Sequence, residues 1–170
     1  AEAGIRDWEV TGVQKWALPI LSPRQRTWTL YAEQLICAAG AIERPLVFAG
    51  NDLPGVMLAG AARTYVNRYG VLPGRNAIVF TNNDDAYLTA RDLARAGARV
   101  SVVECRRRDE VSGAELLGPD VEVHYGHVVT DVRGGLHVRA AKIAPLDGGA
   151  GRVLDCDLLC VSGGWNPSTP

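Results

Sequence analysis

Alternating and continuous runs of hydrophobic residues divide the chain into a β-rich start, an α/β middle and a β-rich end. Polar and apolar residues alternate in Asp7–Thr11 and again in Thr27–Ala32, which predicts two antiparallel strands joined by a loop. Gln34–Ala39 is a short, mostly apolar run that ends at Gly40. Such a run, bounded by glycine, is typical of a strand buried on both faces.

The middle of the chain predicts a strand, a helix and a second strand within about 30 residues, which is a βαβ unit. The two buried strands are Ala77–Phe80 and Val100–Val103. Between them, a helix begins after Asn83 or Asp84, either of which can cap it, and ends at Gly97.

Segments on either side of this unit complete the expected secondary structure. Val56–Tyr69 contains no proline and precedes Gly70, which predicts a helix with a C-terminal glycine cap. Toward the C-terminus the pattern returns to β, with strands expected at 121–125, 128–132, 136–140, 153–157 and 158–161. We expect the tail, Ser162–Pro170, to be a loop.

Composition narrows the possible classes of function. The 170 residues are 47% hydrophobic and carry a formal net charge of -1, which indicates one globular domain with a small annex. Without a basic field, neither nucleic acid nor a membrane surface is an expected partner. No apolar run approaches the ~18 residues that span a membrane, and the start lacks the features of a signal peptide. The four cysteines form no CxxC motif, so we expect a cytoplasmic protein with reduced thiols.

The turn between the first strand and the helix is the natural place for a dinucleotide, but its residues suit one poorly. A dinucleotide site has the pattern Gly-x-Gly-x-x-Gly there, whereas Phe80–Ala86 contains no glycine and places Asp84 and Asp85 where a diphosphate would lie. Glu104 does stand where a ribose-binding acid is expected. Helix capping and nucleotide binding both remain open, with capping favoured.

Two further features bear on the chemistry of the chain: a run of arginines and the absence of a catalytic pair. Arg106–Arg108 could neutralise a 2′-phosphate and so favour NADP, or could be a solvated loop. No nucleophile stands beside a base in a recognisable motif, and no histidine has the spacing of a metal ligand. The residues alone therefore indicate a nucleotide-fold module without catalytic residues.

Three segments occur in an informative order along the chain: Leu35–Ala41, the βαβ unit Asn76–Glu104, and Asp157–Gly164. This order resembles the nested second domain of disulfide reductase-like flavoproteins, with Ala39 in place of a usual threonine. The resemblance implies an α/β fold: a Rossmann-like nested dinucleotide-binding domain with a parallel sheet and antiparallel β excursions. Residues 1–40 would be a β excursion and the return strand of a first nucleotide domain. Residues 41–170 would be the nested domain, with its C-terminal β meander and return strand.

More specific stretches resemble the alpha subunit of heterotetrameric sarcosine oxidase. They are Gly40–Phe48, Asn51–Asp52, Pro54–Ala59, Ala61–Tyr65, Asn67–Val71, Val79–Asp84 and Ser162–Pro167. The glycine-free turn lies within this resemblance, so its weak phosphate grip would be a family trait. The chain would be a fragment from the middle of a longer subunit, lacking that subunit's first nucleotide domain and folate domain.

The resemblance implies a complex that oxidises sarcosine to glycine with O2, giving H2O2 and, with tetrahydrofolate, methylenetetrahydrofolate. NAD would belong to the full alpha subunit, and FAD and FMN mainly to the partner subunit or its interface. The fragment alone would be an inactive scaffold. The candidate cofactor-binding residues are Ala39, Gly40, Ala41, Thr81, Asn82, Asn83, Asp84 and Glu104. No catalytic and no metal-binding residue is expected.

Three alternatives remain open. The chain could be an NAD(P)H-dependent flavoprotein reductase domain that uses Glu104 and the arginine run. It could belong to the alpha subunit of a related enzyme that oxidises proline or opines. It could also be a protein-interaction module that docks through Val56–Tyr69. The sequence does not distinguish NAD from NADP or ATP.

Overall fold

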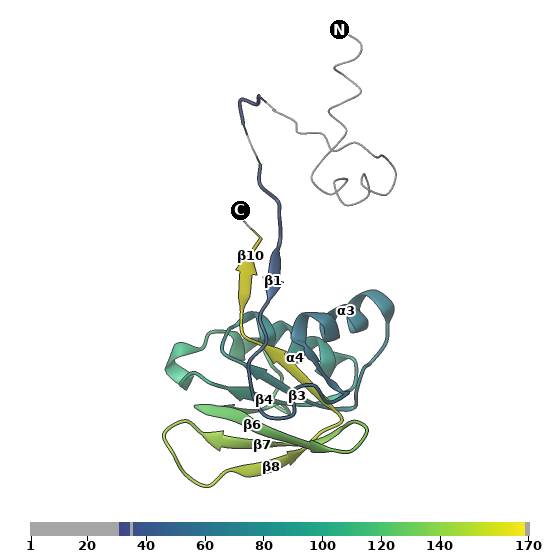
Figure 1. The fold of residues 1–170 in the computed structure, drawn as a ribbon, viewed down its shortest axis with the longest axis vertical. Helices are drawn as coiled ribbons and strands as arrows, with labels where there is room; N and C mark the ends of the chain where they lie inside the picture. The colour runs from purple at the N-terminus through teal and green to yellow at the C-terminus, as the bar shows by residue number, and fades with distance from the viewer. Residues whose placement is uncertain (1–30, 35, 169–170) are drawn as a thin grey trace. The chain divides into compact units, whose positions relative to one another are not determined.

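A computed structural model describes residues 31–34 and 36–168. The chain divides between Ala38 and Ala39, and the second unit, Ala39–Pro170, contains all the helices and strands described below. In this unit a parallel sheet lies between a layer of two helices and a three-stranded antiparallel sheet (Figure 1).

The parallel sheet has five strands in the order β2-β9-β3-β4-β5. Their bounds are Val56–Leu58 (β2), Leu158–Ser162 (β9), Asn76–Thr81 (β3), Arg99–Glu104 (β4) and Glu122–Tyr125 (β5). The central strands are continuous apolar runs because both faces of the sheet are covered. Val79 lies beside Val102 on one side and Cys160 on the other, as expected for the βαβ unit.

Two helices cover one face of this sheet: α3, Ala59–Tyr69, and α4, Asp85–Arg95. The buried residues of α3 include Ala59 and Ala62, whose small side chains permit close packing. The helix ends as predicted at Gly70, whose φ of 64° is left-handed and whose N–H bonds the carbonyl oxygen of Val66. Tyr87, Ala90 and Leu93 of α4 are fully buried in the same core.

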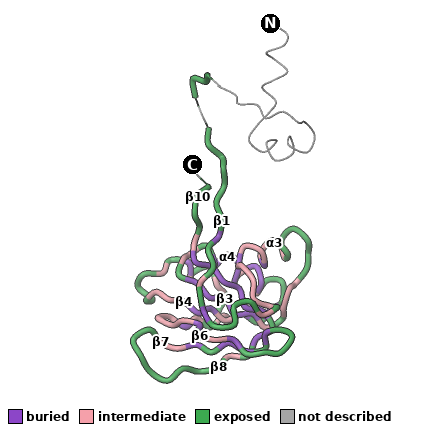
Figure 2. Tube along the Cα trace, viewed as in Figure 1, coloured by how far each residue is buried: buried purple, intermediate pink, exposed green. Residues whose placement is uncertain are grey.

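The antiparallel sheet covers the opposite face. Its strands are β6, His127–Gly134, β7, Val138–Pro145, and β8, Arg152–Asp155. Alternate residues of the parallel strands point to this second core, where Ile78 and Phe80 lie in one cluster with Ile143. Figure 2 shows buried segments in the layers of this body and exposed chain along its loops.

A two-stranded ribbon extends from the body beside the start of α3 (Figure 1). It pairs β1, Ala41–Glu43, with β10, Trp165–Pro167, in antiparallel register. The prediction of a loop over Ser162–Pro170 is therefore wrong for β10. Pairing with a segment more than 100 residues away, which local sequence does not reveal, makes it a strand.

Three further predictions need correction. Val56–Leu58 pairs with β9 as a strand, so the helix begins three residues later than expected. Glu122–Tyr125 belongs to the parallel sheet and not to the antiparallel excursion. Gln34 and 36–39 are exposed and form no strand, because no other described segment pairs with this run.

The predicted strand Asp7–Thr11, and all but the last two residues of Thr27–Ala32, lie outside the described residues. None of the helices within residues 31–34 and 36–168 has the length and apolarity needed to cross a bilayer.

Candidate functional site

The carboxyl ends of β9, β3 and β4 form the edge of the sheet where a nucleotide would bind in this type of fold. Ser162, Thr81 and Glu104 are the last residues of these strands, lie side by side in register, and are completely buried. The turn from β3 into α4 is Thr81–Asp84. The structure thus brings together five predicted site residues: Thr81, Asn82, Asn83, Asp84 and Glu104.

Of the other three predicted residues, Ala41 is the first residue of β1 in the ribbon, and Ala39 and Gly40 directly precede it. Gly40 has a φ of 76° and precedes β1, and Ala41 pairs with Pro167. Ala39, Gly40 and Ala41 are all exposed, and Gly40 accepts a backbone hydrogen bond from Ser168 at 2.9 Å. In the described residues, no hydrogen bond joins them to the Thr81–Asp84 turn.

The Thr81–Asp84 turn is closed by its own hydrogen bonds. The Thr81 hydroxyl bonds both the N–H and the carbonyl oxygen of Asn83, each at 3.1 Å. The Asn83 amide nitrogen donates to the backbone and hydroxyl oxygens of Ser162, at 3.1 and 3.2 Å. Asn83 therefore links β3 to β9, while its buried Oδ1 has no hydrogen-bond partner among the residues that the structure describes.

Asp84 occupies the position before α4, but its side chain does not cap the helix. Oδ1 accepts hydrogen bonds from Nη2 of Arg106 at 2.8 Å and from the N–H of Gly113 at 3.3 Å. Burial alone would raise the pKa of this carboxyl, but these hydrogen bonds and the arginine charge outweigh it and lower the pKa. The expectation of a capping side chain is therefore wrong for Asp84, whose carboxylate holds Arg106 instead.

Both carboxylate oxygens of Glu104 also accept hydrogen bonds from other residues of the chain. Its two oxygens accept hydrogen bonds from Nε and Nη2 of Arg106, at 3.1 and 2.9 Å, and the Tyr87 hydroxyl donates to Oε2 at 3.1 Å. Arg106 thus joins the end of β4 to the start of α4, whereas Arg107 and Arg108 are exposed. A ribose could reach Glu104 only by displacing these partners.

Glu43 is a buried carboxylate at this edge whose contact the sequence did not reveal. From β1, its Oε2 accepts a hydrogen bond at 2.8 Å from the N–H of Gly60, in the first turn of α3. Its relative exposure is only 7%, and the side chain of the neighbouring Arg44 donates a hydrogen bond to the carbonyl oxygen of Gly163. A Cβ on Gly60 would lie 2.8 Å from Oε2, so a larger residue there would require the carboxylate to move.

The electrostatics of Glu43 reflect its buried position. Burial raises the pKa of its carboxyl, hydrogen bonds from Ser162 and Gly60 oppose this change, and the charge of Asp85 adds to it. Glu43 supplies the acidic group that the first turn of α3 itself lacks. Its partner lies 17 residues away, beyond the range of local patterns.

These contacts test whether the edge fits a dinucleotide diphosphate. Such a group needs free N–H groups at a helix N-terminus and a close backbone approach that glycine allows. Here the carboxylate of Glu43 occupies the start of α3, and Asp84 and Asp85 stand at the start of α4. The turn also contains no glycine. The residues present do not fit the diphosphate.

Comparison with known proteins shows which proteins the chain is similar to. No family model matches it. It is 41% identical over 150 residues to a sarcosine oxidase alpha subunit of Corynebacterium sp. (strain P-1), a match that covers 85% of this chain and 16% of that subunit. The corresponding subunit of Rhizobium meliloti (strain 1021) is 41% identical over 146 residues, 85% of this chain and 14% of the subunit. The chain is therefore homologous to a segment that spans about one sixth of these relatives.

Two further likenesses are more distant. A subunit of the opine oxidase of Rhizobium meliloti is 36% identical over 66 residues, 39% of this chain and 14% of that subunit. Among solved structures, thioredoxin reductase of Giardia duodenalis matches with a TM-score of 0.63 and 22% identity, and that of T. acidophilum with 0.62 and 14%. Each of these two matches covers 76% of this chain and 43% of the reductase. The expected fold, a Rossmann-like α/β domain with a parallel sheet and antiparallel strands, is confirmed.

Proposed function

We propose that this chain, as a homologue of a segment of sarcosine oxidase alpha subunits, is the nested nucleotide-type domain of such a subunit, in which it serves as a scaffold. The whole complex would oxidise sarcosine to glycine with O2, giving H2O2 and methylenetetrahydrofolate. Its partners would be the other subunits of a heterotetrameric oxidase, together with a first nucleotide domain and a folate domain of its own longer subunit. On this proposal the chain alone is inactive.

On this proposal, the cofactors are bound outside this chain, by other parts of the complex. NAD would be held by the full alpha subunit, and FAD and FMN by the partner subunit or its interface. Within this chain, Ala39, Gly40 and Ala41 would approach the NAD of the first nucleotide domain through their backbone. Support for this role comes from their exposure and from the absence of a side chain at Gly40.

One observation carries the scaffold role: the chain's own carboxylates occupy the starts of both helices at the nucleotide-binding edge. The carboxylate of Glu43 accepts the N–H of Gly60, and Asp84 is tied to Arg106. Arg106 is held in turn by the buried Glu104. Glu43, Asp84 and Glu104 therefore each bind another part of the chain. These contacts stabilise the domain and leave no site for a phosphate.

A peroxide assay tests this proposal. The purified 170-residue chain is supplied with sarcosine, O2 and FAD, and H2O2 is measured over time. The scaffold role predicts no peroxide above a control without protein, whereas a complete sarcosine oxidase complex assayed in parallel produces it. Sustained, sarcosine-dependent peroxide formation by the chain alone would overturn the proposal.

The alternative function is an NAD(P)H-dependent flavoprotein reductase domain, which the likeness to thioredoxin reductases favours. It predicts that the chain with added FAD oxidises NADPH or NADH and reduces an artificial acceptor. Membership of an opine or proline oxidising complex is the other alternative, supported by the match to the opine oxidase of Rhizobium meliloti. Assaying the assembled complex against sarcosine, proline and an opine separates it from a sarcosine oxidase.

A further inference from the structure

The outer side of the helical layer is built from three connections between strands. They are α3, α4 and residues 109–120, here called the acidic segment, which contains the short helix η2, Gly113–Leu116. The three connections join β2, β3, β4 and β5 in order, so right-handed crossovers place them side by side with α4 in the middle. η2 packs against α4, and Ala114 and Leu117 contact the core beneath the helices.

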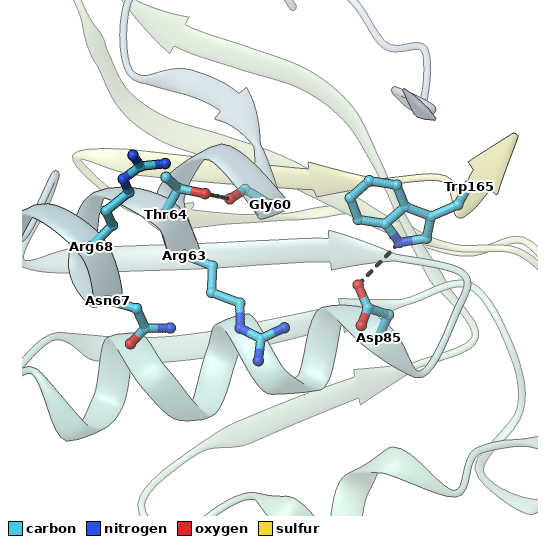
Figure 3. Close-up of a pocket in the computed structure, with 7 residues that line it drawn as sticks. All are labelled: Gly60, Arg63, Thr64, Asn67, Arg68, Asp85 and Trp165. Atoms are coloured by element: carbon cyan, nitrogen blue, oxygen red, sulfur yellow. Dashed lines mark hydrogen bonds between the residues drawn. The ribbon is translucent and has the colours of Figure 1, made fainter. Parts of the chain in front are cut away.

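α3 forms the positive side of this face. Its sequence includes Arg63 and Arg68 and no acidic residue. Nε of Arg63 lies 3.0 Å from Oδ2 of Asp92 on α4, so this arginine already has a partner. Arg68 is exposed and forms no ion pair within residues 31–34 and 36–168. Figure 3 shows Arg63 extending toward α4 and Arg68 pointing away from it. Arg68 is therefore the charge on α3 that a partner can reach.

The acidic segment forms the negative side. It contains four acidic residues and neither lysine nor arginine. Glu115 and Asp120 are exposed, and in the described part of the chain neither of them forms an ion pair. α4 lies between these carboxylates and α3, and the axes of packed helices are about 8–10 Å apart. Within one molecule, the charges of Glu115 and Asp120 therefore stay apart from that of Arg68.

Exposed apolar side chains accompany both sets of charges. Tyr65 and Tyr69 of α3 are 44% and 60% exposed, and their ring centres are 6.0 Å apart. The Arg68 guanidinium lies 5.7 Å from the ring centre of Tyr69. Leu116 of the acidic segment is 42% exposed. Tyrosine and arginine are enriched among the residues that contribute most to protein–protein binding, so this face has the composition of an interface.

A two-fold axis parallel to α4 brings the two complementary sides together. Rotation by 180° about this axis lays α3 of each copy on the acidic segment of the other, so each contact is made twice. α3 and the acidic segment both run from the carboxyl edge of the sheet to its amino edge. Arg68, near the end of α3, therefore meets the part of the segment that contains Glu115 and Asp120. A two-fold axis perpendicular to α4 would instead oppose Arg68 to Arg68.

We propose that this face is a self-interface, on which a second copy of the chain docks about a two-fold axis along α4. Arg68 of each copy faces Glu115 and Asp120 of the other, and the complementary charges of one sequence select a second copy as the occupant. Ion pairs at an exposed surface are weak and are screened by salt, so the dimer is weak and salt-sensitive. The interface goes beyond the proposed scaffold role, since it involves neither a cofactor nor a reaction.

Sedimentation velocity of the purified 170-residue chain, at micromolar to millimolar concentrations, tests this interface. We expect a monomer–dimer equilibrium whose dissociation constant rises at least tenfold between about 0.05 and about 0.5 M salt. Arg68→Glu and Glu115→Arg should each weaken the dimer at least tenfold, because each variant opposes like charges twice. An equimolar mixture of these two variants should associate as the natural chain does. In the mixed dimer one contact has its charges exchanged and the other is unchanged, so both are attractive.

Arg95→Glu is the matched control. Arg95 is the last residue of α4 and is exposed, so it lies close to the axis and faces its own copy. The same change of charge there should leave the dissociation constant unchanged, because like charges face each other before and after the substitution. Circular dichroism checks that every variant is folded.

Four results would overturn the proposal. The natural chain stays monomeric, which would leave this face to a different partner; salt has no effect on the dimer; the mixture of variants fails to associate; or Arg95→Glu weakens the dimer as much as Arg68→Glu. None of these results bears on the peroxide assay.

Discussion

Replacing Arg106 by Met tests the network that fills the nucleotide-binding edge. The substitution keeps an unbranched apolar stem and removes the only side-chain cation bonded to both Glu104 and Asp84 in the described structure. Glu104 is 0% exposed, so it would be left as a buried charge without its partner. Removing one member of a buried ion pair typically costs about 3–5 kcal/mol. Arg106 is itself 24% exposed, which lets water reach the vacated space and favours the lower end, about 3 kcal/mol.

Urea denaturation of the chain, followed by circular dichroism, measures this loss. Arg107→Met is the matched control, because Arg107 pairs with Asp109, at 3.5 Å, and the two side chains are 80% and 73% exposed. Losing this exposed ion pair should change the free energy of unfolding little. The double variant Glu104→Gln/Arg106→Met leaves no unpaired buried charge, because Asp84, the other partner of Arg106, is 44% exposed, and it should recover much of the stability. Equal stability of the Arg106→Met and Arg107→Met variants would refute the view that this network is a structural substitute for a ligand.

Further predictions concern pH and thiol chemistry. Folding raises the pKa of Glu43 above its ordinary value of 4.5, so ionisation of this carboxyl destabilises the folded chain as the pH rises. In urea titrations, Glu43→Gln should therefore gain stability relative to the natural chain between pH 4 and pH 7. Burial, reinforced by Arg152, lowers the pKa of His124 below 6.5; the natural chain should therefore lose stability relative to His124→Asn as pH falls from 7 to 5. Cys37 is exposed, whereas burial raises the pKa of Cys156 to about 12, so mass spectrometry after brief alkylation at pH 8 should find Cys37 modified first.

The sequence predicted the central βαβ unit because its strands are continuous apolar runs and its helix has a regular apolar spacing. It failed where pairing with distant residues decides the structure. Val56–Leu58 is compatible with a helix or a strand, and only its pairing with β9 makes it a strand. β10 likewise depends on β1, which lies more than 100 residues earlier.

The sequence predicted which residues share the edge of the sheet, but not the contacts that they make. The absence of glycine drew attention to the Thr81–Asp84 turn, whose residues lie at the edge of the sheet with Glu104. The sequence could not show that Arg106 binds Asp84, because that contact joins two separate elements. Glu43 was missed for a similar reason: its partner is a backbone N–H, which no side-chain pattern identifies.

The central claim is that carboxylates of this chain take the places where a dinucleotide diphosphate would bind. Calorimetric titration of the chain with NAD and with NADP measures this directly. We predict no saturable heat with either nucleotide at concentrations up to the millimolar range. Micromolar binding of either one, lost on substitution of Arg106 or of the residues of the Thr81–Asp84 turn, would contradict the claim.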